Sequence, residues 1–78
     1  SAMERMASFL LNLADRLSSG DQVRLPMQRG DLADHLGLTI ETVSRTLTQM
    51  VRADLIRLAE AGHTIVLTDK NGLQLLAA

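Results

Sequence analysis

Two short segments with helical periodicity stand only three residues apart, on either side of the turn that contains Gly37. The first runs from about Arg29 to Leu36, and Gly37 occupies the position where a left-handed residue commonly ends a helix. The second runs from Ile40 to about Ala53, and the hydroxyl of Thr39 is placed to cap its start. A connection this short makes the two helices cross steeply. The crossing leaves no room for bulk at Ala33 and Gly37. The wedge between the helices is expected to hold Leu32, Leu36, Leu38, Val43 and Leu47.

The flanking segments complete a recognisable order. Residues 3 to 17 have a helical apolar stripe, which Ser18, Ser19 and Gly20 end, and Val23 to Leu25 alternate like a short edge strand before Pro26. The runs Leu55 to Ala59 and Thr64 to Leu67, joined by the tight connection Glu60 to Gly62, predict a hairpin. A last short helix can be capped by Thr68 or Asp69. The predicted fold is mostly α with a small β-hairpin, in the order of a winged helix-turn-helix.

The first helix has a wide apolar face. Phe9 and Leu11 flank the stripe on both sides, giving an arc that exceeds what a small domain needs. One explanation is a deeply buried helix, and the other is contact with a part of the protein that this sequence lacks. We expect residues 1 to 3 to be a cloning remnant. We assign residues 4 to 20 to the first helix and the end of a linker or dimerisation region, and residues 21 to 78 to the DNA-binding unit.

Composition narrows the classes of function. A chain of 78 residues makes at most one domain, and with Phe9 as its only aromatic residue it has no platform for stacking single-stranded RNA. The absence of cysteine excludes disulfides, zinc ribbons and thiol catalysis. No apolar run approaches the roughly 20 residues needed to cross a bilayer, so we expect a soluble, cytoplasmic protein. The net charge of −1 argues against a nucleic-acid partner unless the charges are unevenly placed.

The second helix of the pair has two different faces. Val43, Leu47 and Met50 form a stripe expected to be buried, whereas Glu41, Ser44, Arg45 and Thr48 lie on the far side. A short-chained polar face with one arginine and one carboxylate fits a DNA major groove, where arginine can bind guanine and a carboxylate can accept from cytosine. The simpler reading is an exposed ion pair between Glu41 and Arg45, worth only about 0.3 to 0.5 kcal/mol. Within a helix-turn-helix, we favour the first reading.

At this point the segment LPMQRGDLADHLGLTIETVSRTL resembles the DNA-binding segment of the Crp and Fnr superfamily of bacterial transcription regulators. The motif E-x-x-S-R, here Glu41, Ser44 and Arg45, is typical of the Fnr and FixK branch. The resemblance extends from about residue 9 to the end. It implies a homodimer with an amino-terminal sensor barrel and a long dimerisation helix, binding a palindromic operator in double-stranded DNA with TTGA-like half-sites.

The resemblance also implies roles for single residues. Glu41, Ser44 and Arg45 would read bases with Ile40 beside them. The positions expected to contact DNA phosphates are Gln28, Arg29, Thr39, Thr42 and, on the outward face, Thr48. Gln28 departs from the hydroxyl residue often found at its position. No cofactor is expected in this chain, because any effector would bind the missing sensor domain. RNA polymerase is a candidate partner of the whole regulator.

Two other classes of function compete with DNA binding. A winged-helix module for protein contacts would use the apolar face of the first helix and leave Glu41 and Arg45 solvated. An enzyme is disfavoured because no nucleophile, base and orienting group occur together in a motif. His35 and His63 lack the spacing of metal ligands, and Asp31 and Asp34 fit a solvated helix face. Gly30, Gly37 and Gly62 form no phosphate-binding loop.

Overall fold

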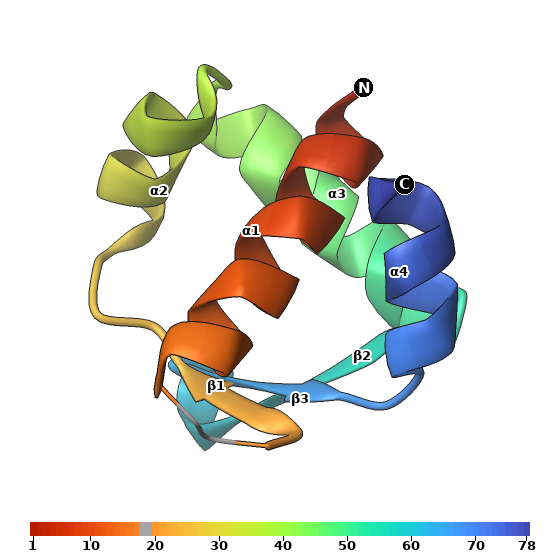
Figure 1. The fold of residues 1–78 in the computed structure, drawn as a ribbon. Helices are drawn as coiled ribbons and strands as arrows, with labels where there is room; N and C mark the ends of the chain where they lie inside the picture. The colour runs from red at the N-terminus through yellow and green to blue at the C-terminus, as the bar shows by residue number, and fades with distance from the viewer. Residues whose placement is uncertain (18–19) are drawn as a thin grey trace.

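The computed structural model describes residues 1–17 and 20–78. Within these ranges the helices are α1 (Ala2–Leu17), α2 (Arg29–Leu36), α3 (Ile40–Arg52) and α4 (Lys70–Ala77), and the strands are β1 (Gln22–Arg24), β2 (Ile56–Ala59) and β3 (Thr64–Leu67). A 3₁₀ turn, η1 (Glu60–Gly62), connects β2 to β3. Figure 1 shows the helices above the sheet, with α1 crossing in front of α3 and α4 lying beside α1. The predicted winged helix-turn-helix is confirmed.

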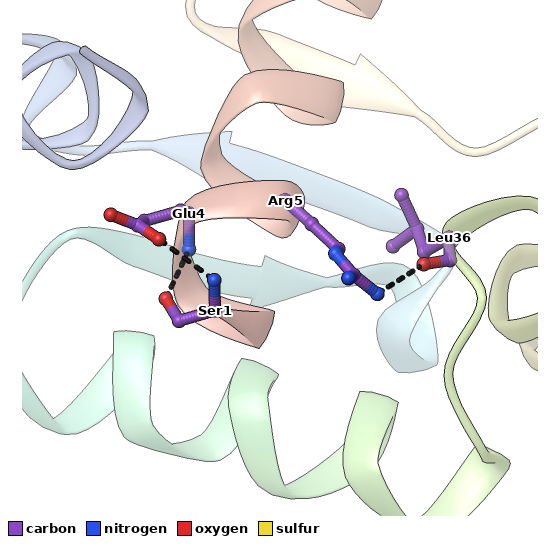
Figure 2. Close-up of polar contacts among 4 residues, drawn as sticks. All are labelled: Ser1, Glu4, Arg5 and Leu36. Carbon is purple, nitrogen blue, oxygen red and sulfur yellow. Dashed lines mark hydrogen bonds and ion pairs between the residues drawn. The ribbon is translucent and has the colours of Figure 1, made fainter.

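Polar contacts fix the start of α1, as Figure 2 shows. The Ser1 hydroxyl oxygen accepts from the Glu4 backbone N–H at 3.2 Å, and the Ser1 ammonium donates to Glu4 Oε1 at 2.7 Å. Hydrogen bonding to that ammonium lowers the pKa of the Glu4 carboxyl. Arg5 donates through Nη1 to the Leu36 carbonyl at 3.2 Å. The Leu36 carbonyl is free to accept because the last carbonyls of a helix have no partner within it. This bond joins the first turns of α1 to the end of α2.

The apolar face of α1 is used inside the domain. Its buried residues are Met6, Ala7, Phe9, Leu10, Leu13 and Ala14. Phe9 is only 7% exposed and meets the His35 ring edge-on at 5.3 Å between centroids, and Leu11 packs partly buried against the core. The arc is therefore no wider than the domain needs, because α4, α3 and β1 all pack against α1. Ser18 and Ser19, part of the predicted end of this helix, lie outside the described residues.

The three strands form one antiparallel sheet in the order β1-β3-β2. β2 and β3 make the predicted hairpin, with Ile56 opposite Leu67, and β1 pairs with the other edge of β3, with Val23 opposite Ile65. The edge strand ends at Arg24 rather than at Leu25. The Leu25 backbone N–H instead donates to the His63 carbonyl at 2.9 Å, beyond the ladder. The hairpin together with η1 is called the wing below.

The last helix, α4, is capped by one of the two residues that the sequence analysis named. Asp69, not Thr68, is the N-cap, and its Oδ1 accepts from the Gly72 backbone N–H at 3.0 Å. α4 then buries Leu73 and packs against α1. This helix closes the core on the side away from α2 (Figure 1).

Candidate nucleic-acid interface

The turn between α2 and α3 has the geometry that the Gly37 pattern predicts. Gly37 has φ 70° and ψ 34°, and its N–H donates to the Asp34 carbonyl at 3.3 Å while the Leu38 N–H donates to the Ala33 carbonyl at 2.8 Å. This pair of bonds is a Schellman motif, which satisfies the last carbonyls of α2 and reverses the chain. The two helices pack against each other directly after the turn.

Thr39 caps α3 as predicted. Its hydroxyl oxygen accepts from the Thr42 backbone N–H at 3.2 Å and its hydroxyl donates to Thr42 Oγ1 at 3.0 Å. Thr42 therefore stands in for the longer side chain of a capping box at the third helical position. The cap fixes the residue at which α3 begins, and with it the direction in which every later side chain of α3 points.

The two faces of α3 separate as the sequence predicts. Val43, Leu47 and Met50 are buried in the core, and Thr46 joins them as a buried polar residue. The opposite face exposes Glu41, Ser44, Arg45 and Thr48. Ile40 is 51% exposed at the start of the helix and is one of several large apolar side chains on the surface of the domain. The outward face thus combines short polar groups, one guanidinium, one carboxylate and one apolar side chain.

Glu41 and Arg45 do not satisfy each other. Among the ion pairs of residues 1–17 and 20–78, none joins these two side chains, although they stand four residues apart on one helix. The simpler reading, an internal surface pair, is therefore not what this structure contains. Both charged ends are left available to an external partner.

The start of α2 lies next to the start of α3. A Cβ added at Gly30 would be 3.7 Å from Ile40 Cδ1, so the first turn of α2 borders the exposed isoleucine. Gln28 occupies the N-cap position of α2 but makes no side-chain cap bond, and it is exposed. Gln28, which stands where a hydroxyl residue is often found, therefore does not use its side chain to cap α2.

Arg29 is placed differently from the other predicted phosphate residues. Its Nη2 donates to the Gly62 carbonyl of the wing at 2.8 Å, and the side chain is partly buried. Burial lowers the pKa of the Arg29 guanidinium, which nevertheless stays charged at neutral pH. A hollow of about 370 Å³ adjoins this contact, lined by Leu25, Met27, Gln28, Arg29, Gly30, Ala61, Gly62 and His63.

The sequence gives no signal for the contact between Arg29 and Gly62. The two residues are 33 positions apart, and the hairpin prediction places Gly62 at a turn without indicating which helix it approaches. Thr48, another predicted phosphate residue, also makes a contact within the domain. Its hydroxyl donates to the Ser44 carbonyl at 3.0 Å, within α3 itself. Such back-bonding occupies the proton that a phosphate would need.

Charge is unevenly distributed, which answers the objection from the net charge of −1. α3 carries Arg45 and Arg52 against Glu41 alone, a net charge of +1, and its positive helix end adds to this. Elsewhere two acidic groups pair with basic ones, Glu60 with Arg24 at 2.8 Å and Asp21 with Lys70 at 3.7 Å, so these pairs contribute no net charge. The recognition face is therefore more positive than the whole chain.

The described part of the chain contains neither a metal-binding cluster nor a membrane-spanning helix. No group of three or more histidine and acidic residues there could hold a metal ion. No helix in the described ranges is long and apolar enough to span a bilayer. His35 is accounted for by its ring contact with Phe9.

Comparison with known proteins gives a consistent set of relatives. Residues 4–76 match the family described as the Crp-like helix-turn-helix domain. The chain is 55% identical over 60 residues to the nitrogen fixation regulation protein FixK of Rhizobium meliloti (strain 1021), covering 77% of this chain and 28% of the relative. It is 48% identical over 82 residues to the FixK protein of Bradyrhizobium diazoefficiens, covering 100% of this chain and 34% of the relative. The chain thus spans about a third or less of the length of these relatives.

Solved structures agree with the sequence relatives. The structure of FixK2 from Bradyrhizobium japonicum superposes with a TM-score of 0.90 at 44% identity, over 100% of this chain and 39% of that chain. The CO-dependent transcription factor CooA from Carboxydothermus hydrogenoformans, at 23% identity and a TM-score of 0.83, shares the fold. The chain belongs to the Crp-like helix-turn-helix family and is a winged helix-turn-helix DNA-binding domain of the Crp/Fnr type.

Proposed function

We propose that this domain reads one TTGA-like half-site of a palindromic operator by placing α3 in the major groove of double-stranded DNA. The observation that carries the proposal is the outward face of α3. Glu41 and Arg45 are exposed there without pairing to each other, directly opposite a buried apolar stripe. A helix with this division of faces is held firmly by its core side while its polar side stays free to meet bases.

The proposed base contacts follow from side-chain chemistry. The Arg45 fork can donate two hydrogen bonds to guanine O6 and N7, and the Glu41 carboxylate can accept from a cytosine amino group. Ser44 can donate to or accept from a base edge. Ile40, half exposed at the start of α3, offers an apolar surface for a thymine methyl group. These four residues supply the chemistry that a mixed half-site such as TTGA demands.

The proposed phosphate contacts surround this face. Gln28 and Thr39 are exposed at the starts of α2 and α3, where helix dipoles favour phosphate, and Thr42 lies one turn into α3. The remaining N–H groups of Arg29 border the hollow beside the wing and can donate to a phosphate. The hydroxyls of Thr39 and Thr48 can donate to a phosphate only if they rotate away from Thr42 Oγ1 and from the Ser44 carbonyl, respectively.

At the level of the whole regulator, we propose a homodimer whose two domains occupy the two half-sites. The relatives are about three times the length of this chain, which leaves room for a sensor and a dimerisation helix. Any effector would bind in that sensor, and this domain needs no cofactor for base reading. RNA polymerase is a proposed partner of the whole regulator. The alternative of a protein-contact module loses most of its working surface, since most of the apolar face of α1 is buried.

A fluorescence anisotropy titration tests the proposal. The chain is titrated into a duplex with a TTGA-containing palindrome and into a scrambled duplex of equal composition, at one fixed moderate salt concentration. We expect tighter binding to the palindrome, because base contacts add to the phosphate contacts that both duplexes share. Equal affinity for both duplexes, or no binding to either at high protein concentration, would contradict base reading by α3.

A further inference from the structure

The tip of the wing has a backbone conformation that needs external support. Glu60, Ala61 and Gly62 follow one another with φ of 52°, 57° and 86°. Side chains other than glycine rarely adopt this left-handed region, so Glu60 and Ala61 are both strained. Such strain persists only where surrounding contacts determine the conformation.

Within the described ranges, three polar contacts join residues 60–63 to residues 24–29. The Leu25 backbone N–H donates to the His63 carbonyl at 2.9 Å. Arg24 pairs with Glu60 at 2.8 Å, but both side chains are more than half exposed, at 72% and 59%, so solvent screens the pair. Arg29 donates to the Gly62 carbonyl at 2.8 Å from a partly buried position. A charged donor shielded from water makes the stronger bond, so Arg29 is the side chain best placed to hold the tip.

The fit around Gly62 is close. A Cβ added at Gly62 would come within 3.1 Å of Arg29 Nη2, tighter than an ordinary contact. Gly62 therefore serves two purposes: it adopts the left-handed conformation, and it lets the guanidinium reach the carbonyl. On its other side Arg29 is followed by Gly30, which borders Ile40 at the start of α3. A continuous strip thus runs from α3 through the first turn of α2 to the wing.

We propose that Arg29 is a positioning residue whose guanidinium fixes the wing tip against α2 before DNA binds. The spacing between α3, which lies in the groove, and the wing, which lies beside it, is then set in the free protein. This role differs from a phosphate contact, because it is made to a carbonyl of the same chain. Its consequence for DNA affinity rests on the proposed function, whereas the fixing of the wing does not.

The first experiment is amide hydrogen exchange of the free chain. Wild type is compared with Arg29→Gln, Arg29→Lys and the matched control Arg24→Gln, which removes one positive charge from the exposed contact to the same tip. We expect exchange at residues 60–63 and at Leu25 to become at least about tenfold faster in both Arg29 variants, with α1 and α3 unchanged, because only the tip opens. Arg24→Gln should change little. Lysine should not restore protection, because its ammonium is strongly hydrated and stands on a shorter side chain that does not reach as far as Arg29 Nη2 does to the Gly62 carbonyl.

Two results of the exchange experiment would overturn the proposal. Unchanged tip exchange in Arg29→Gln would show that the contact does not hold the wing. Equal acceleration at every amide would show that Arg29 acts on global stability rather than on the position of the tip.

The second experiment is a double-mutant cycle on DNA affinity with Arg29→Gln and Gly62→Ala. The added methyl disturbs the contact only while the guanidinium is present, so Gly62→Ala should weaken binding about threefold or more beyond its effect in the Arg29→Gln background. Independent effects would refute a role of the contact in DNA binding. If wild type itself fails to bind DNA, the proposed function falls while the exchange result still decides the fixing of the wing.

Discussion

At the scale of single residues, the exposed and unpaired guanidinium of Arg45 is the feature with the clearest consequence. It lies opposite the buried Val43 and Leu47, so the role in base reading that we propose for it is separate from the core. The absence of an ion pair with Glu41 among the described residues removes the main structural task that its position suggested. Effects of changing it should therefore separate cleanly into binding and stability.

We predict that Arg45→Ala costs about 1 to 3 kcal/mol on the matched half-site and relaxes the preference for guanine at one position. Arg45→Lys should not restore that preference, because an ammonium cannot bind O6 and N7 as a fork. The measurement is a binding series with all four bases at each half-site position, with thermal melting as the control. An Arg45→Ala variant that keeps the wild-type base preference, or that melts at much lower temperature, would show that Arg45 is structural.

At the scale of elements, the turn and the cap between α2 and α3 decide how α3 is presented. Gly37 supplies a positive φ, and Thr39 satisfies an N–H at the start of α3. Both lie within a connection of three residues, so a change in the backbone conformation at either one changes the orientation of the outward face of α3.

We predict that Gly37→Ala lowers the free energy of unfolding by about 1 kcal/mol or more, because alanine pays the left-handed penalty at this position. The reason is conformational rather than steric, since the nearest atom to an added Cβ is Arg5 Nη1 at an ordinary 3.6 Å. Gly37→Asn should lose less, because asparagine tolerates this region better. Urea unfolding of the three proteins checks the ranking; equal losses for alanine and asparagine would point to crowding instead.

We predict that Thr39→Ala destabilises the domain by about 0.5 to 2 kcal/mol through loss of the cap, whereas Thr39→Ser keeps most of the stability. DNA affinity of the alanine variant should fall by a similar factor on specific and scrambled duplexes, because a phosphate contact does not read sequence. Denaturation and anisotropy titrations on the same samples separate the two effects. A loss confined to the specific duplex would assign Thr39 to base reading.

At the scale of the whole molecule, one domain presents one recognition helix. Two half-sites of a palindrome lie about 34 to 36 Å apart, one turn of DNA, so a second linked copy would bind as an intramolecular step.

We predict that fusing this chain to a parallel dimeric coiled coil tightens binding to the palindrome by about 100-fold or more at constant salt, through effective concentration alone. The matched control is a duplex with a single half-site, on which the fusion should gain little. Analytical ultracentrifugation verifies that the unfused chain is monomeric. An unfused monomer that already matches the fusion on the palindrome would contradict the proposed use of two domains.

The sequence by itself determined the parts of this protein that depend on near neighbours. The Gly37 turn, the Thr39 cap, the two faces of α3 and the hairpin all follow from residues at most a few positions apart, where backbone preference and periodicity act. The bounds of α2 were predicted to the residue, and those of the first strand and β2 to within one. The proposed base-reading residues share this origin, because one helix face is fixed by spacing alone.

Tertiary structure decided what distant residues do to one another. The wide apolar face of α1 packs against α4, α3 and β1. No local sequence pattern shows that these three elements would cover it. Arg29 donates to the Gly62 carbonyl, which lies 33 positions away in the sequence. Glu41 and Arg45 form no ion pair among the described residues, although their spacing on the helix permits one. Periodicity says which way a side chain points along its own element. The residue that a side chain contacts is decided by how the elements pack. Burial and competition between hydrogen-bond acceptors then matter more than the spacing of residues along the chain.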